Sequence, residues 1–263
     1  MLRVRKKFGQ HFLEPAWADR LVEAIAPRSG DRFLEIGPGR GALTSRLAPR
    51  VAALTAVEID PQMVAALAHR VPSNVTIVGA DILEFDISAA AGGSKVRVAG
   101  NLPYNISSPI LFRLLAAHRA CGCLVDATLM LQREVAERIR ASPGSRDYGV
   151  LSILIQLHAD VRPLLNLPPG AFRPAPKVHS AVVALAFRGP AVALSDEALF
   201  EGMVRSMFTQ RRKMLGNALS GFAEQLGWAA SDALTCADID PSRRPETLQL
   251  TELARLAEVF GSS

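Results

Sequence analysis

The chain has 263 residues, of which 49% are hydrophobic, so it can bury a full core, and a disordered class is excluded. Three cysteines, with no metal-ligand cluster beside the Cys121-X-Cys123 pair, indicate a reduced protein of the cytoplasm. No run of 18 apolar residues and no signal-peptide core is present, so neither a membrane span nor secretion is expected. The net charge is +5, and residues 1–180 hold 22 Lys and Arg against 15 Asp and Glu, which favours an anionic partner such as nucleic acid.

Short apolar runs alternate with helical patterns over the first two thirds of the chain. A helix is predicted over 16–25, ahead of the first strand. The predicted strands are RFLEI (32–36), ALTAVEI (53–59), NVTIV (74–78), KVRVAG (95–100) and ATLML (127–131). The helical patterns between them cover 40–49, 62–70, 107–119 and 132–141. This order predicts βαβ units and a parallel sheet in an α/β domain.

Two later runs, LSILIQL (151–157) and KVHSAVVALAF (177–187), are β-rich and are expected to complete the sheet. The segment RGPAVALSD (188–196) contains Gly and Pro and loses the strand pattern. Helical patterns follow it, over 196–208, 211–226 and 251–260. We therefore predict an α/β domain over 1–189 and a small helical domain over 190–263.

The stretch FLEIGPGRGALT (33–44) is a strand, a turn with Gly37, Gly39 and Gly41, and then a helix. Glycines at such a turn let backbone N–H groups approach a ligand closely. Taken as Gly37, Gly39 and Ala42, the loop also fits the dinucleotide fingerprint. Alone, it does not choose between NAD and another nucleoside ligand.

Three acidic residues help to identify the kind of nucleoside ligand. Glu35 lies in the first strand just before the glycines, Glu58 ends the second strand, and Asp81 follows the third. At the Glu58 position a carboxylate can accept both ribose hydroxyls, and Asp81 can accept from an exocyclic amine. Each alone is more often a solvated carboxylate, but together they mark the edge where open α/β sheets bind ligands.

The stretch AGNLPYNISSPI (99–110) follows the fourth strand at the same edge. The side-chain oxygen of Asn101 and a carbonyl of Leu102 or Pro103 can accept the two hydrogens of a planar amine such as that of adenine. Pro103 fixes the backbone so that these acceptors are placed before the substrate arrives. Tyr104 offers a flat face on which the base can stack.

With these blocks the sequence resembles the small-subunit ribosomal RNA adenine dimethyltransferases. The resemblance runs through KFGQHFL, EIGPGRGALT, VEID, GADIL, GNLPYNISSPI, MLQREVAERI, YGVLSILIQ, PPGAFRPAPKVHSAVV and FTQRRKMLGNAL. It implies a Rossmann-like class I methyltransferase domain followed by a small all-helical domain. It also implies transfer of two methyl groups from S-adenosylmethionine to N6 of each of two adjacent adenosines near the 3′ end of small-subunit rRNA. That reaction leaves S-adenosylhomocysteine and needs no metal.

The resemblance also implies roles for residues. The cofactor contacts are expected to be His11, Leu13, Glu35, Gly37, Gly39, Gly41, Glu58, Asp81 and Asn101. Gly37 is placed at the methionine part, Glu58 at the ribose and Asp81 at the adenine. His11 stands where many members carry Asn. The expected partner is rRNA within an immature small subunit, and the expected protein is a cytoplasmic monomer.

On the substrate side, Asn101 is implied to touch both the methionine end and the target amine, next to Leu102, Pro103 and Tyr104. Phe172, in AFRPAPKV, is implied to sandwich the flipped base against Tyr104. The candidate rRNA phosphate contacts are the basic residues Arg3, Arg5, Lys6, Lys7, Arg211, Arg212 and Lys213.

Three other functions remain open. A large-subunit rRNA adenine methylase is disfavoured by the EIGPG and NLPY forms and by the long C-terminal match. A non-catalytic ribosome-assembly or transcription factor is disfavoured by the intact Glu58, Asp81 and NLPY set, although a binding role is compatible with activity. An NAD-dependent oxidoreductase is disfavoured because that function does not explain the NLPY turn.

Overall fold

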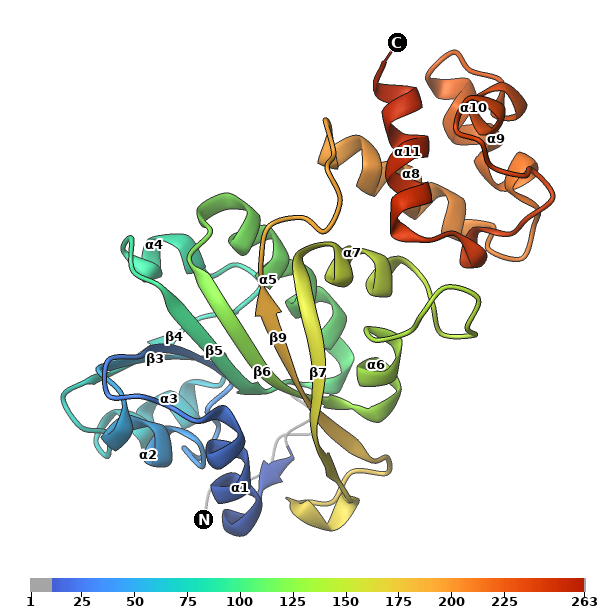
Figure 1. Ribbon diagram of the computed structural model, residues 1–263. Coiled ribbons are helices and arrows are strands. Elements are labelled where there is room, and N and C mark those ends of the chain that lie inside the picture. Colours follow the sequence, from blue (N-terminus) through green and yellow to red (C-terminus); the bar gives the residue numbers. More distant parts are fainter. Residues whose placement is uncertain (1–10, 263) are drawn as a thin grey trace. The chain divides into compact units, whose positions relative to one another are not determined.

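The structure is a computed structural model that describes residues 11–262, and Figure 1 shows its elements. These residues form two compact units. The first contains residues 11–136 and Asp160–Phe187, and the second contains Glu137–Ala159 and the chain from Arg188 onward. The second unit therefore combines the C-terminal helices with a segment that comes earlier in the chain.

The first unit is built on a seven-stranded sheet with the order β4-β3-β2-β5-β6-β9-β7. Its strands are β2 (Arg32–Ile36), β3 (Ala53–Glu58), β4 (Val75–Gly79), β5 (Val96–Asn101), β6 (Leu124–Gln132), β7 (Ala159–Leu167) and β9 (Ser180–Phe187). Strands β2 to β6 pair in parallel, and β9 is antiparallel to β6. The predicted mostly parallel sheet is confirmed. Its strand order reverses between β2 and β5, where open α/β sheets bind their ligands.

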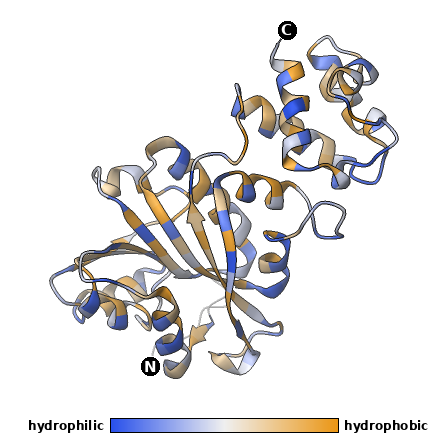
Figure 2. Ribbon diagram, in the orientation of Figure 1, coloured by the Kyte–Doolittle hydropathy of each residue, from blue (hydrophilic) through white to orange (hydrophobic). Residues whose placement is uncertain are grey.

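Helices lie on both sides of this sheet (Figure 1). They are α1 (Pro15–Ile25), α2 (Thr44–Leu47), α3 (Pro61–Ala68), α4 (Ile87–Ala91), α5 (Ser107–Cys121) and the start of α6 (Arg133–Arg138). Because both faces are covered, neighbouring residues such as Phe33 and Leu34 are both buried although they point to opposite faces. The central strands are accordingly mostly hydrophobic, with charged residues such as Arg97 in β5 and Asp126 in β6, whereas edge strand β7 carries hydrophilic stretches (Figure 2).

A small second sheet pairs β1 (Phe12–Leu13) with β8 (Phe172–Arg173) in antiparallel register. Leu13 lies opposite Phe172, and both belong to the core that α1 and α2 share with the main sheet. This pairing holds the segment around residue 12 beside the edge of the main sheet where the polar residues gather.

The segment 151–157 was expected to be a strand, and this expectation is wrong. It forms helix α7 (Val150–His158), which is buried on nearly all sides. A short run that is apolar at every position fits a buried helix as well as a strand. The hydroxyl of Ser152 settles the helical start, because it accepts from the Gly149 N–H at 3.1 Å and donates to the Arg138 carbonyl at 2.6 Å.

The second unit is mainly helical. Besides α7 it contains α8 (Glu197–Thr209), α9 (Leu215–Gln225), α10 (Ala230–Cys236) and α11 (Leu250–Gly261). Asp196 caps α8 by accepting from the Leu199 N–H at 2.9 Å. Within residues 11–262, no helix is both long and apolar enough to cross a membrane.

Cys121 and Cys123 are joined by a disulfide, so the expectation of reduced cysteines is wrong for this pair. Helix α5 ends at Cys121 and is capped by Gly122, whose left-handed backbone (φ +57°) turns the chain sharply. The turn brings the two Cα atoms to 5.1 Å, within the span that a disulfide bridges. Cys236 is free and exposed.

Candidate active site

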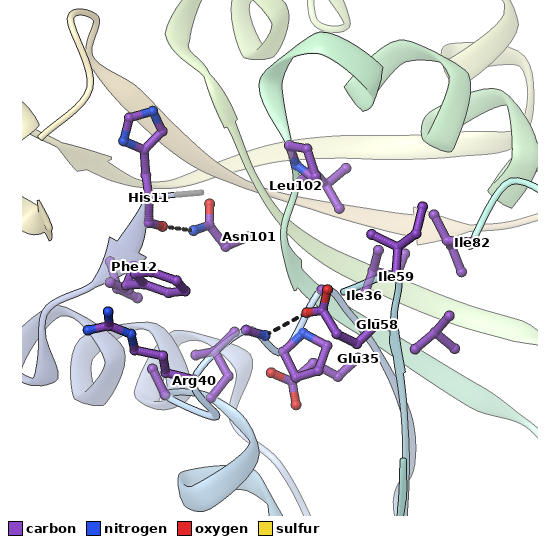
Figure 3. A pocket seen from close by; sticks show the side chains of 18 of the residues that line it. His11, Phe12, Glu35, Ile36, Arg40, Glu58, Ile59, Ile82, Asn101 and Leu102 are labelled. Carbon is purple, nitrogen blue, oxygen red and sulfur yellow. Dashed lines mark hydrogen bonds between the residues drawn. The ribbon is translucent and has the colours of Figure 1, made fainter. Parts of the chain in front are cut away.

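A cavity of about 460 Å³ opens at the carboxyl ends of β2, β3, β4 and β5 (Figure 3). This volume is typical of sites for small molecules and cofactors. The predicted residues that line it are His11, Leu13, Glu35, Gly37, Gly39, Glu58, Asp81, Asn101, Leu102, Pro103 and Tyr104. Gly41 and Phe172 do not line it. Most of the predicted site is thus brought together around one cavity.

The glycine loop after β2 adopts backbone angles that favour glycine. The φ values are +66° at Gly37, +55° at Gly39 and +83° at Gly41. A Cβ on Gly39 would lie 3.1 Å from the ring of Phe12, and one on Gly41 would lie 2.7 Å from Cδ2 of Leu67. Gly39 therefore keeps the loop close under Phe12, whereas Gly41 shapes the loop from the side away from the cavity.

The Glu58 carboxylate is fixed by backbone donors from two sides. Oε2 accepts from the Gly39 N–H at 3.0 Å, and Oε1 accepts from the Asp60 N–H at 2.9 Å. Figure 3 shows the bond to the loop as a dashed line. Each carboxylate oxygen keeps a further lone pair, so Glu58 can still accept hydroxyl hydrogens from a ligand.

Glu35 lies deeper than Glu58 and is only 1% exposed. The Thr44 hydroxyl donates to its Oε2 at 2.8 Å. Burial raises the pKa of Glu35 to about 7; the hydrogen bond from Thr44 opposes this rise and the nearby Glu58 adds to it. Glu35 therefore supports the glycine loop as a carboxyl group that is protonated over part of the neutral range.

Asp81 and two isoleucines form the side of the cavity beyond Glu58. Oδ1 of Asp81 accepts from the Leu83 N–H at 2.9 Å, which orients the carboxylate. Ile59, which is 47% exposed, and the buried Ile82 both line the cavity. Apolar walls beside an oriented carboxylate suit a flat ring that carries an amine.

Sequence reasoning missed the apolar lining residues Phe12, Ile59 and Ile82. Each directly neighbours a predicted polar or loop residue in HFL, VEID or GADIL. For Ile59 and Ile82, the available signal was an isoleucine placed directly after a strand-end carboxylate. The guanidinium of Arg40 lies 4.2 Å above the Phe12 ring centre, which adds a cation–π contact to this wall.

Asn101, at the end of β5, is held by the residue that precedes the small sheet. Its Nδ2 donates to the carbonyl oxygen of His11 at 2.8 Å (Figure 3). Ile36 pairs with Gly100 in register, so the glycine loop and Asn101 start from adjacent strand ends. Because the amide nitrogen is used, the Asn101 Oδ1 is left as an acceptor for another donor.

Tyr104 opens the short helical turn η3 (Tyr104–Ile106). Its hydroxyl is hydrogen-bonded to the buried Ser180 hydroxyl at 2.6 Å. Burial raises the pKa of Tyr104 above its ordinary value, with the Ser180 bond acting in the opposite direction, so the phenol is neutral near pH 7. The Pro103 carbonyl accepts from the Ile106 N–H at 3.2 Å, which closes the turn.

Phe172 does not face Tyr104 across the cavity. Its side chain is fully buried in the core, where it lies opposite Leu13 in the small sheet. Strand β8 points this ring inward because the antiparallel pairing with β1 directs it toward the core. The structure thus does not bring the two predicted stacking residues together.

The predicted rRNA contacts fall into two groups. Arg3, Arg5, Lys6 and Lys7 lie outside the described residues. Arg211 pairs with Glu246 at 2.6 Å and donates to the Ser145 carbonyl at 3.2 Å, so it is tied into the second unit. Arg212 and Lys213 are exposed. Across residues 11–262, no group of three or more His, Cys, Asp or Glu could hold a metal ion.

Comparison with known proteins identifies the family. The family model described as ribosomal RNA adenine dimethylase matches residues 1–257. A ribosomal RNA small subunit methyltransferase A of Xanthomonas oryzae pv. oryzae is 45% identical over 259 residues, covering 97% of this chain and 95% of the relative. The protein of the same name from Chromohalobacter salexigens is 46% identical over 265 residues, covering 97% and 90%.

Two solved structures agree with this. The crystal structure of a dimethyladenosine transferase from Plasmodium falciparum has a TM-score of 0.81 and 27% identity, covering 96% of this chain and 98% of that one. The 23S rRNA methyltransferase ErmE has a TM-score of 0.69 and 25% identity, covering 95% and 99%. The predicted class I methyltransferase fold and the resemblance read from the sequence are both confirmed. The chain belongs to the ribosomal RNA adenine dimethylase family.

Proposed function

We propose that this protein transfers methyl groups from S-adenosylmethionine to N6 of two adjacent adenosines near the 3′ end of small-subunit rRNA. The product is a pair of N6,N6-dimethyladenosines. The observation that carries the proposal is the Asn101 amide, whose Nδ2 is held by the His11 carbonyl while Oδ1 stays available at the cavity. The names of the relatives support rRNA of the small subunit as the substrate.

The cavity fits S-adenosylmethionine in volume and in the chemistry of its walls. Glu58 would accept from the ribose hydroxyls, and Asp81 from the adenine amine, between Ile59 and Ile82. Gly37 and Gly39 would leave room for the methionine part beside Asn101. When bound, the cofactor supplies an electrophilic methyl group on a positively charged sulfur.

The residues around Asn101 hold the target amine in a reactive form. The N6 nitrogen of adenine is a poor nucleophile while its lone pair is delocalised into the ring. Asn101 Oδ1 and one backbone carbonyl accept its two hydrogens, which favours a pyramidal nitrogen. Since the Pro103 carbonyl already accepts from the Ile106 N–H, the Leu102 carbonyl is the better second acceptor.

No side chain has to remove a proton before attack, because the nitrogen becomes acidic as it gains the methyl group. Catalysis then rests on positioning and on electrostatic complementarity. The adenine must leave its stack, which costs a few kcal/mol and less in a loop that is already single-stranded. Because rRNA of the small subunit is the proposed substrate, we propose that the protein acts in the cytoplasm on an immature small subunit. We propose that it acts as a monomer.

The test is nucleoside mass spectrometry of rRNA after incubation with S-adenosylmethionine. Small subunits that lack adenine dimethylation are the substrate, and Asn101→Ala is the comparison. We expect dimethyladenosine from the parent protein and a rate at least about 100-fold lower from the variant. Large subunits form a parallel arm, because ErmE, a 23S rRNA methyltransferase, has a similar structure.

Equal product from the parent protein and Asn101→Ala would leave an adenine methyltransferase but refute the role given to Asn101. Product on large subunits alone would refute the small-subunit substrate. If neither subunit is methylated while S-adenosylmethionine still binds, the proposed reaction is wrong and a binding role is favoured.

A further inference from the structure

Arg113 reaches from helix α5 to the turn that carries Asp81. Its Nη2 donates to the Phe85 carbonyl oxygen at 2.8 Å. Ile110 lies one helical turn earlier, so the two side chains lie on the same side of α5. Ile110 is buried and lines the cavity, whereas Arg113 does not line it. The side of α5 that borders the cavity thus continues to the Asp81 turn.

The turn over residues 81–85 closes on Asp81. The Asp81 carbonyl oxygen accepts from the Glu84 N–H at 3.0 Å and from the Phe85 N–H at 2.9 Å. Its side-chain Oδ1 accepts from the Leu83 N–H at 2.9 Å. Because these bonds lie within the turn, the carboxylate moves with the turn, and the position of the turn decides where the carboxylate lies.

Neighbouring elements hold the turn at both of its ends. On the side of β4, the Ala80 N–H donates to the Glu58 carbonyl oxygen at 3.1 Å, which ties the chain to the end of β3. At the other end, Arg113 ties the Phe85 carbonyl to α5. Two such contacts fix the direction in which a short turn presents its side chain, whereas loss of one lets the turn pivot about the other.

Arg113 is a costly residue if its task is packing alone. The side chain is half-buried, and its Nε is buried without a hydrogen bond to any of the residues that the structure describes. Burying an N–H donor without a partner costs free energy, which an apolar side chain such as that of Met would avoid. The carbonyl that the guanidinium reaches therefore gives a reason for a cation at this place.

We propose that Arg113 is a positioning residue for the cofactor, which holds the Phe85 carbonyl so that the Asp81 carboxylate stays at the adenine amine. The inference rests on the proposed function, in which Asp81 accepts from that amine. Arg113 touches neither the cofactor nor the reacting atoms. It makes the site selective for adenine, because a carboxylate held in place loses its partner when the amine is missing. A carboxylate that can swing into water loses little.

Binding of two ligands to the full chain tests this. The ligands are S-adenosylhomocysteine and its analogue with hydrogen in place of the adenine amine, and calorimetry measures both affinities. Arg113→Met keeps the length of the side chain without donors, and Arg113→Lys keeps a charged donor on a shorter stem. Arg119→Met is the matched control, because it removes an exposed cation from the same helix. The melting temperature of each variant controls for folding.

We expect the parent protein to bind S-adenosylhomocysteine at least about tenfold more tightly than the analogue, since the analogue lacks a hydrogen bond to a charged group. In Arg113→Met this ratio should fall to about threefold or less, while the affinity for the analogue changes less than about twofold. Arg113→Lys should give a ratio between these two, and Arg119→Met should keep the parent ratio. Methyl transfer by Arg113→Met at saturating S-adenosylmethionine should keep kcat within about threefold of the parent value.

The parent ratio in Arg113→Met would overturn the inference. Equal weakening for both ligands would also overturn it, because that is the result of a merely structural role. If Arg113→Met does not fold, Arg113→Lys decides in the same way: a lowered ratio supports the inference, and the parent ratio overturns it. If the parent protein binds both ligands equally, the role of Asp81 in the proposed function fails and the inference fails with it, so the two failures are distinguishable.

Discussion

Individual side chains at the site are held by contacts made within the protein itself. Glu58 accepts from two backbone N–H groups, Asn101 donates to the His11 carbonyl, and Tyr104 is tied to Ser180. Such contacts lower the cost of ordering each group when a ligand binds. Glu35 differs from these residues because burial raises the pKa of its carboxyl group.

Glu35 should make folding stability depend on pH. Its pKa is about 7 in the folded protein and 4.5 in the ordinary state, so between these values the folded protein keeps a proton that the unfolded chain has released. Stability is therefore highest below pH 4.5 for this group and falls as the pH rises to 7, by about 3 kcal/mol. Glu35→Gln should lack this part of the decline. Urea unfolding at pH 5 and pH 8 measures it, and equal declines in the two proteins would contradict the prediction.

Phe172 should contribute to stability and not to base stacking. Phe172→Ala is expected to lower the free energy of unfolding by about 3–5 kcal/mol, because it leaves a cavity in the core. Phe172→Leu keeps an apolar side chain but no ring, and it should retain most methyl transfer at a temperature where it is folded. Loss of transfer in both variants, at nearly unchanged stability, would restore the stacking role to Phe172.

The pairing of neighbouring strand ends fixes where the side chains of the site lie. Ile36 and Gly100 are partners across β2 and β5, and the NLPY turn begins at the next residue. A Cβ on Gly100 would lie 2.8 Å from the Ile36 carbonyl oxygen, a backbone atom that can shift only if strand β2 shifts with it. At Gly79, which ends β4, a Cβ would make only ordinary contacts, with Val64 Cγ2 at 3.6 Å and Val64 Cγ1 at 3.8 Å.

This contrast gives a matched pair of variants. Gly100→Ala should force β2 and β5 apart, lower stability by about 1–3 kcal/mol and reduce methyl transfer strongly. Gly79→Ala should be close to the parent protein in both respects. Thermal melting and the methylation assay are the measurements. Equal behaviour of the two variants would show that the strand pair adapts to a side chain.

The elements that sequence predicted well are those with a clear period and a clear end. The strand 32–36 and the helix at 16–25 fall within a residue of their predicted bounds, because a polar or turn residue flanks each apolar run. The run 151–157 lacked such a period. Strand β7 was not predicted because it carries charged residues and Pro163, which an edge strand tolerates. The cavity's carboxylates were predictable from strand ends. The stacking of the His11 ring on the Tyr104 ring was not, because it joins segments more than 90 residues apart.

Charge is the property of the whole chain that bears on its partner. The net charge of +5 favours an anionic partner, but the basic residues do not contribute equally. Arg211 is engaged by Glu246 inside the second unit, whereas Arg212 and Lys213 are exposed on the same turn. Variants of these neighbouring residues can therefore distinguish a loss of stability from a loss of RNA binding.

Replacing Arg212 and Lys213 by Gln should weaken binding to small subunits and reduce the slope of log K against log salt by about 1.5. The melting temperature should not change. Arg211→Gln is the control, because it removes the ion pair with Glu246 and should lower stability. Filter binding at several KCl concentrations measures the slope. A slope unchanged in the double variant would place the rRNA contacts elsewhere.

The small sheet joins residues that are synthesised far apart in time. Strand β1 (Phe12–Leu13) is translated long before its partner β8 (Phe172–Arg173), and the carbonyl that holds Asn101 comes from the residue just before β1. A growing chain that has produced the glycine loop and the NLPY turn still lacks the partner that holds this segment in place. The site should thus acquire its final geometry late in translation, after β8 has been made and can pair with β1.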